Sequence, residues 1–156
     1  ESFSGSLSLN GLTSAKDLKI PESFSGFLSL NGLTSAKDLK IPESFKGLSL
    51  DGLTSAEGLK IPESFSGFLS LNGLTSAKDL KLPKSVKWLF LNGLTSAKDL
   101  KLPKLINKRL WLEGLISIQD LELPSLIGGK IVLNSLSKSE KDALKLKYPH
   151  LANKIQ

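Results

Sequence analysis

One block of sequence, LNGLTSAKDLK, recurs along the 156-residue chain with few changes. Its leading leucines stand 20 or 21 residues apart, at Leu9, Leu30, Leu50, Leu71, Leu91, Leu112 and Leu133. A fixed period of this length is typical of a solenoid, in which each repeat is too short to bury a core alone and stacks on its neighbours. Equivalent residues then form columns along the stack, so a position where a column changes its residue type is where function should be sought.

Each repeat predicts two extended sides joined by corners. Leu28-Ser29-Leu30 alternates apolar and polar residues and runs into Asn31-Gly32, a pattern typical of a short strand that enters a turn. A second alternation, Leu39-Lys40-Ile41, ends at Pro42, which has no N–H to donate to a neighbouring strand. Between the two sides, residues 33–38 favour a single helical or 3₁₀ turn, with a tight bend as the alternative.

Three columns predict the architecture of the stack. In the second coil the inward side chains should be Leu28, Leu30, Leu33, Ala36, Leu39, Ile41 and Phe45. Burial of each large one stabilises the fold by about 1.5–3 kcal/mol. A glycine column predicts a corner that needs positive φ or a close approach between coils, at Gly11, Gly32, Gly52, Gly73, Gly93 and Gly114. A polar column predicts hydrogen bonds from side chains to the backbone of neighbouring corners, at Asn10, Asn31, Asp51, Asn72, Asn92, Glu113 and Asn134.

These patterns predict a repeat solenoid, a parallel β coil of about seven repeats with a C-terminal capping α-helix. The segment LKLPKSVKWLFLNGLTSA resembles the LxxLxL strand core of bacterial short-period leucine-rich repeat proteins, and the LxIPxS segment resembles one surface-protein subgroup of that family. The resemblance covers nearly the whole chain. It implies a right-handed coil whose parallel sheet displays the outward residues of LxL to a partner, and a cell-surface or secreted location.

The chain divides into a solenoid over residues 1–136, with the first coil incomplete, and a helical cap over residues 137–156. Glu1-Ser2-Phe3-Ser4-Gly5 repeats the text of residues 22–26, so the chain starts partway through a coil and we expect it to belong to a longer protein. In the cap, Ser137 and Glu140 have capping-box spacing, and Pro149 stands where the helix should stop. Four apolar residues should cover the last coil and its sheet edge: Leu144, Tyr148, Leu151 and Ile155.

The outward residue of the first strand changes along the stack. It is Ser8, Ser29, Ser49 and Ser70, and then Phe90, Trp111 and Val132. Parallel strands lie about 4.8 Å apart, so the last three should form one exposed apolar strip. Such a patch usually marks a contact, and Trp88 and Arg109, which belong to types favoured at interfaces, should extend and flank it. The alternative is that this strip packs under the C-terminal helix or a loop.

Lysines form a second column, at Lys19, Lys40, Lys60, Lys81 and Lys101, and the formal net charge is +6. Nearby Asp and Glu residues should neutralise this column and leave a solvated face. The alternative is that the lysine column binds a polyanion such as nucleic acid. No aromatic residue interleaves the column, so nucleic acid is not the favoured partner. The repeated Thr-Ser pairs are best explained as turn residues rather than as an ice-binding array.

Nothing in the sequence favours an enzyme or a cofactor. The chain has no Cys and a single histidine, His150, which should lie on the surface of the cap. A nucleophile–base pair or a metal site built on these residue types therefore has no second member. No apolar run approaches the length of a membrane span. The favoured function is binding of a protein partner through Trp88, Phe90, Arg109, Trp111 and Val132. The alternative is a structural spacer, or a rod that self-associates through its uncapped N-terminal end.

Overall fold

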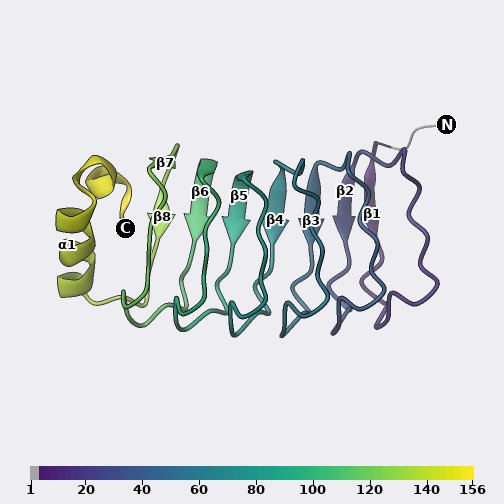
Figure 1. The fold of residues 1–156 in the computed structure, drawn as a ribbon, viewed down its shortest axis with the longest axis horizontal. Helices are drawn as coiled ribbons and strands as arrows, with labels where there is room; N and C mark the ends of the chain where they lie inside the picture. The colour runs from purple at the N-terminus through teal and green to yellow at the C-terminus, as the bar shows by residue number, and fades with distance from the viewer. Residues whose placement is uncertain (1–3) are drawn as a thin grey trace.

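A computed structural model describes residues 4–156 as a parallel β-solenoid that ends in a helix (Figure 1). The winding makes about six turns with a period of about 21 residues. The predicted fold class is therefore confirmed, with about six turns in place of the expected seven coils. The repeated text expected at Glu1-Ser2-Phe3 lies outside the described residues.

Eight strands form one sheet in the order β1-β2-β3-β4-β5-β6-β7, and β8 also pairs with β6. Every pairing is parallel. The strands are β1 Ser6–Ser8, β2 Phe27–Ser29, β3 Gly47–Ser49, β4 Phe68–Ser70, β5 Ser85–Phe90, β6 Leu105–Trp111, β7 Leu126–Ile127 and β8 Ile131–Val132. Since β7 and β8 both lie beside β6, the eight strands occupy seven positions along the rod.

The register places equivalent residues of successive coils opposite each other. Leu28 pairs with Leu48, Leu48 with Leu69, and Leu69 with Leu89, and all four side chains are buried. The inward residues predicted for the second coil are also buried, except that Ile41 is only partly covered. One continuous apolar core thus runs the length of the rod, as a solenoid requires.

Strands β5 and β6 are longer than the strands before them because a turn has been lost. In two earlier coils a backbone hydrogen bond closes a turn after the proline, from Phe24 to Pro21 and from Phe65 to Pro62. The β-branched residues Val86 and Ile106 lie on the extended backbone of β5 and β6 and are fully buried. Such residues favour extended backbone, so the strand begins earlier in these coils.

The glycine column marks a close approach between coils. Each corner after the strand is a tight turn, in which the Leu33 N–H donates to the Leu30 carbonyl oxygen at 3.1 Å. A Cβ atom at Gly32 would overlap the backbone oxygen of Asn10 in the preceding coil, and the same holds for Gly52 and Asn31. Close approach, one of the two explanations predicted for this column, is therefore confirmed. Positive φ is not, because among the described glycines only Gly58 has positive φ, and Gly58 lies outside this column.

The helical or 3₁₀ turn expected over residues 33–38 is wrong, and the tight bend is found instead. Leu39 donates its N–H to the Ala36 carbonyl oxygen at 3.1 Å, and Asp38 has φ of 64°. A residue with positive φ at the third position is typical of a type II turn and cannot continue a helix. The aspartates of this column all share the conformation, at Asp17, Asp38, Asp79, Asp99 and Asp120.

The second side of each coil forms no strand in residues 4–156. Lys40 is exposed between buried Leu39 and partly buried Ile41, so the predicted alternation is present. A proline closes this side in the successive coils, at Pro21, Pro42, Pro62, Pro83, Pro103 and Pro124. Each of them lacks the N–H that a ladder of hydrogen bonds would need at that level. The sheet is therefore confined to one side of the rod.

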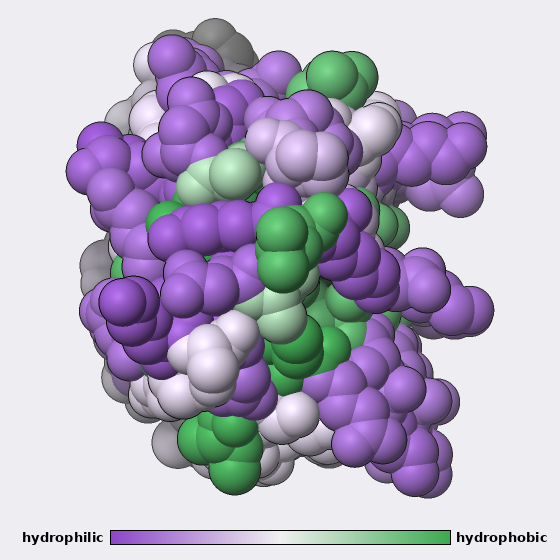
Figure 2. All heavy atoms as spheres, turned by 90° about the vertical axis from the view of Figure 1, so that its left-hand side faces the viewer, coloured by the Kyte–Doolittle hydropathy of each residue, from purple (hydrophilic) through white to green (hydrophobic). Residues whose placement is uncertain are grey.

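The C-terminal cap forms as predicted. Helix α1 spans Lys138–Lys147, and the Ser137 hydroxyl and the Glu140 carboxylate complete a capping box. The hydrogen bonds from the side chain and then the backbone of Ser137 hold the pKa of Glu140 below its ordinary value. The 3₁₀ helix η1, Pro149–Lys154, follows. Seen from this end, the cap presents a mostly hydrophilic surface with separate hydrophobic areas (Figure 2).

The cap seals the end of the core and the sheet edge. Leu144, Leu151 and Ile155 are buried and Tyr148 is partly buried, as predicted. The backbone of Gln156 bonds to the final coil, because its N–H donates to the Ile131 carbonyl oxygen and its carbonyl oxygen accepts from the Leu133 N–H. Tyr148 adds a bond in which its hydroxyl oxygen accepts the Leu123 N–H at 3.2 Å.

The close approach of the coils predicts that substitution by alanine lowers stability at one glycine of the column and leaves it unchanged at another. Gly52→Ala would place a methyl group on the Asn31 oxygen, and we expect it to lower the free energy of unfolding by about 2 kcal/mol or more. Gly11→Ala is the matched control, because a Cβ there meets nothing within 4 Å. Urea unfolding of both variants tests this, and equal stabilities would contradict the reading of the column.

Candidate binding surface

The outer face of the sheet carries two rows of side chains, at the first and third positions of the short strands. Residues two apart on a strand point to the same face, and the buried leucine between them points inward. In the first row, Phe68 pairs with Trp88, which pairs with Arg109. In the second row, Ser70 pairs with Phe90, which pairs with Trp111, and Trp111 pairs with Val132. All five residues predicted from the sequence as a binding surface thus lie on neighbouring strands.

In the early coils the second row belongs to a hydrogen-bond network with the polar corner column. Asn31 Oδ1 accepts from the Ser49 hydroxyl at 2.7 Å and from the Asp51 N–H at 2.9 Å. Asp51 Oδ1 accepts in the same way from Ser70 at 2.6 Å and from Asn72 at 2.8 Å. The predicted bonds from side chains to the neighbouring backbone are confirmed, and the serine hydroxyls join them.

The serine half of this network ends where the large apolar residues begin. Asn72 Oδ1 still accepts the Asn92 N–H at 3.0 Å, and Asn92 Oδ1 accepts the Glu113 N–H at 3.1 Å. Phe90 and Trp111 have no hydroxyl to offer at the serine position. In these coils the bond to the corner N–H is kept without the serine bond, and the outward side chain is released from the network.

The released positions carry a stack of aromatic rings. Phe90 and Trp111 lie with ring centroids 4.0 Å apart and planes 10° apart. Phe68 extends the stack, 5.1 Å from Phe90, and Phe27 lies 6.1 Å from Phe68. We call Phe68, Trp88, Phe90, Trp111 and Val132 the outer strip. Phe90, Trp111 and Val132 are each partly exposed.

Phe27 and Phe68 are members of this surface that the sequence reading missed. The prediction took Trp88 and Arg109 from the position two residues before the outward residue, but it did not follow that column back into the earlier coils. Phe27 also reaches across β3, because Gly47 leaves the space that its ring fills, and Phe27 is 44% exposed. The period of two along a strand was the signal that could have found both residues.

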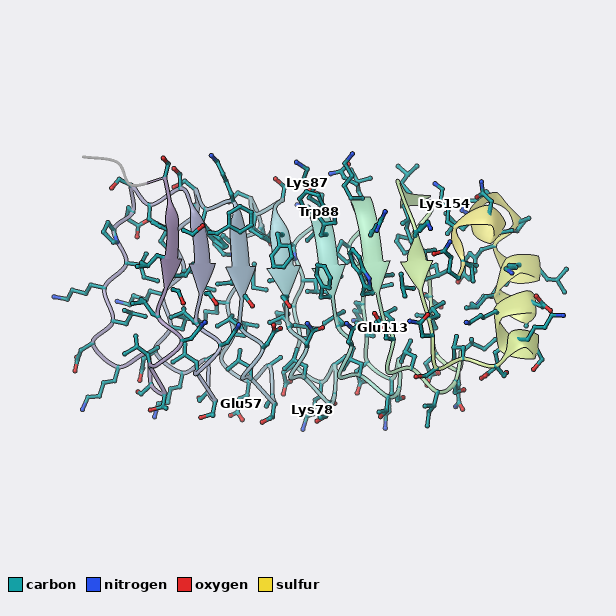
Figure 3. The ribbon with its side chains drawn as sticks, turned by 180° about the vertical axis from the view of Figure 1, so that it is seen from behind. Glu57, Lys78, Lys87, Trp88, Glu113 and Lys154 are labelled. Carbon is teal, nitrogen blue, oxygen red and sulfur yellow. The ribbon has the colours of Figure 1, made fainter. Side chains whose placement is uncertain are left out.

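Cations lie against the tryptophans. Lys87 Nζ lies 4.9 Å from the ring centroid of Trp88, and the Arg109 guanidinium carbon lies 5.9 Å from that of Trp111. Figure 3 shows Lys87 and Trp88 together at one edge of the sheet, and Glu57 and Lys78 at the opposite corner of the coils. Contacts at these distances are attractive and hold the cationic groups beside the strip.

The C-terminal helix does not lie over the outer strip. In Figures 1 and 3, α1 packs beyond β8 at the end of the rod, and the sheet face lies to one side of it. Lys154 reaches back from η1 to the Ile127 carbonyl oxygen, which ties the cap to β7. The alternative that the strip is covered by this helix is therefore not what the structure shows.

Other candidate groups carry less chemistry. Among residues 4–156 the lysine column makes no ion pair within 4.0 Å, so the expected neutralisation is limited to longer range, and the ion pair found nearby joins Lys84 to Glu63 at 3.3 Å. His150 lies exposed on η1, as expected. Within the described part of the chain, no group of three potential metal ligands gathers. No helix there is long and apolar enough to cross a membrane.

Comparisons with protein-family models, with curated proteins and with solved structures find no match for this chain. The structure itself shows the class of fold, a parallel β-solenoid with turns of about 21 residues and a C-terminal helix. The resemblance to bacterial leucine-rich repeat proteins stays a prediction, together with the location that it implies.

The corner network predicts a graded loss of stability. Asp51→Ala should lower the free energy of unfolding by about 2 kcal/mol, because it leaves the buried Ser70 hydroxyl and the Asn72 N–H without acceptors. Asn92→Ala removes the acceptor of a single N–H, so about 1 kcal/mol is expected. Asp51→Asn keeps the acceptor and is the control. Denaturant unfolding measures both losses, and a larger loss of stability for Asn92→Ala than for Asp51→Ala would contradict this assignment.

Proposed function

We propose that the chain is a non-enzymatic recognition module that binds a protein partner through the outward face of its sheet near the C-terminal coils. The observation that supports this is the exchange of serine for large apolar residues in the second row. Ser29, Ser49 and Ser70 show that the coil folds with a small hydroxyl residue at this position. The aromatic residues at the equivalent positions are therefore not required by the winding.

The composition of the outer strip is that of a contact surface. Trp and Arg are the residue types most enriched at interface hot spots, and Trp88, Trp111 and Arg109 lie on two adjacent strands. Partly exposed rings on a continuous face also supply the apolar area that a partner can remove from water. Strands β5 and β6, which carry most of the outer strip, are paired with neighbouring strands on both sides, so we expect the surface to be rigid before a partner binds.

The chain supplies its own control for the test. Phe90→Ser/Trp111→Ser restores the residues of the early coils, and each new hydroxyl faces an Asn oxygen that already bonds the corner, at Asn72 and Asn92. We expect the free energy of unfolding of this double variant to lie within about 1 kcal/mol of that of the parent protein, because the serine network offsets part of the lost ring packing.

Binding is measured by panning a display library of random peptides on the parent protein and on the double variant. The proposal predicts peptides that bind the parent and lose at least about tenfold in affinity on Phe90→Ser/Trp111→Ser, or about 1.4 kcal/mol. A library that yields no such peptide would contradict it. The alternative role, a structural spacer or self-associating rod, would then take its place.

A further inference from the structure

The side of the sheet on which the strands begin, which we call the edge beside the outer strip, changes its charge along the rod. The residue after each coil proline is acidic in the early coils, at Glu22, Glu43 and Glu63, and basic in the next two, at Lys84 and Lys104. The side chains of Glu63 and Lys84 meet in an ion pair at 3.3 Å. The charge of this position therefore reverses between the coil that carries Phe68 and the coil that carries Trp88 and Phe90.

Beyond that point the edge is densely cationic. Strands β5 and β6 contain Lys87, Lys108 and Arg109 and no carboxylate, and Lys130 lies on the neighbouring coil. All four side chains are exposed, and no ion pair within 4.0 Å joins them to a described residue. The carboxylate that follows β6, Glu113, lies at the opposite edge of the sheet, where it accepts from Asn134 at 3.2 Å (Figure 3).

The ring stack restricts what can bind beside these cations. Phe90 has Phe68 and Trp111 as ring neighbours, and Trp111 has Phe90 on one face and the Arg109 guanidinium 5.9 Å from its centroid. Nucleobases bind such surfaces by stacking on an open aromatic face. Phe90 and Trp111 cover one face of each other, and Phe68 lies against Phe90 at a tilt of 46°. Fewer ring faces are therefore open to a base, and the surface suits the apolar side chains of a polypeptide.

We propose that the partner binds through an acidic segment, with carboxylates against Lys87, Lys108, Arg109 and Lys130 and apolar side chains on the outer strip. This inference rests on the function proposed above and adds the chemistry of the partner. Charge complementarity of this kind speeds association and sets the register of docking. The acidic edge of the early coils would repel the same segment and so limit it to the C-terminal coils.

The test uses three synthetic peptides of Gly and Ser that carry two Phe at the same positions and differ only in four Glu, four Gln or four Lys. Fluorescence anisotropy at low salt should show that the Glu peptide binds at least about tenfold more tightly than the Gln peptide, and the Lys peptide least tightly. The advantage of Glu over Gln should shrink at about 1 M salt, where the Debye length is about 3 Å.

Charge-reversed variants locate the effect. Lys108→Glu/Arg109→Glu and, separately, Lys87→Glu/Lys130→Glu should each remove most of the Glu advantage. Lys78→Glu/Lys98→Glu is the matched control, because it makes the same change in net charge at the exposed corner far from Trp88 (Figure 3). Thermal unfolding checks that every variant is folded. Equal losses in the edge variants and in the corner control would overturn the inference.

The outcomes separate this inference from the proposed function. If the Gln peptide binds as tightly as the Glu peptide, and Phe90→Ser/Trp111→Ser abolishes both, the strip is a binding surface and the acidic partner is wrong. If no peptide responds to that double variant, both proposals fail. A single-stranded oligothymidine that binds more tightly than the Glu peptide through the same residues would overturn the inference in favour of nucleic acid.

Discussion

The spacing between coils at the polar corner is the constraint on which the rest of this structure depends. There, an Asn or Asp oxygen of one coil accepts the backbone N–H of the next, as Asn31 does from Asp51. The glycine beside it, such as Gly52, lets the backbones approach closely enough for that bond. Because this contact repeats from coil to coil between Asn10 and Glu113, leucines stack on leucines and outward residues stack on outward residues. A row of side chains on the sheet then behaves as one surface, although its members are about 20 residues apart in sequence.

The same corner explains how the outer face can vary without loss of the winding. The hydrogen bond from the Asn92 N–H to Asn72 Oδ1 is kept when the serine hydroxyl bond is lost at Phe90. An aromatic residue can therefore replace serine at the cost of one side-chain hydrogen bond, and ring stacking offsets part of it. The longer strands β5 and β6 then extend the sheet on the side where Lys87 and Arg109 lie. The variation of a repeat protein is thus concentrated on a face that the repeat itself leaves free.

Much of this fold could be predicted because periodicity turns a local pattern into a contact between coils. The core leucines, the corner bonds and the close approach at glycine follow from columns that repeat, whereas the capping box of Ser137 and Glu140 follows from local spacing in the cap, which does not repeat. The turn at Asp38 was only the alternative prediction, because Ser-Ala-Lys-Asp has no Gly or Pro to signal positive φ. The equivalent residue of the next coil, Gly58, has φ of 76° and was a signal that could have favoured it. Phe27 and Phe68 were missed because their column is interrupted by Gly47, and it takes the structure to show that the Phe27 ring fills that gap. The partner of the outer strip is set by chemistry outside this chain, and no column of residues encodes it.

The coils stack in one register, and this register brings Phe90 and Trp111 into contact. Nuclear Overhauser spectroscopy on protein with selectively labelled Phe and Trp tests it most directly, because near-identical coils could otherwise pair one repeat out of step. We expect strong cross-peaks between the Phe90 ring and the Trp111 indole, because their ring centroids lie 4.0 Å apart. Cross-peaks that join Trp111 to Ser70 or Phe68, with none to Phe90, would show a slipped stack and contradict it.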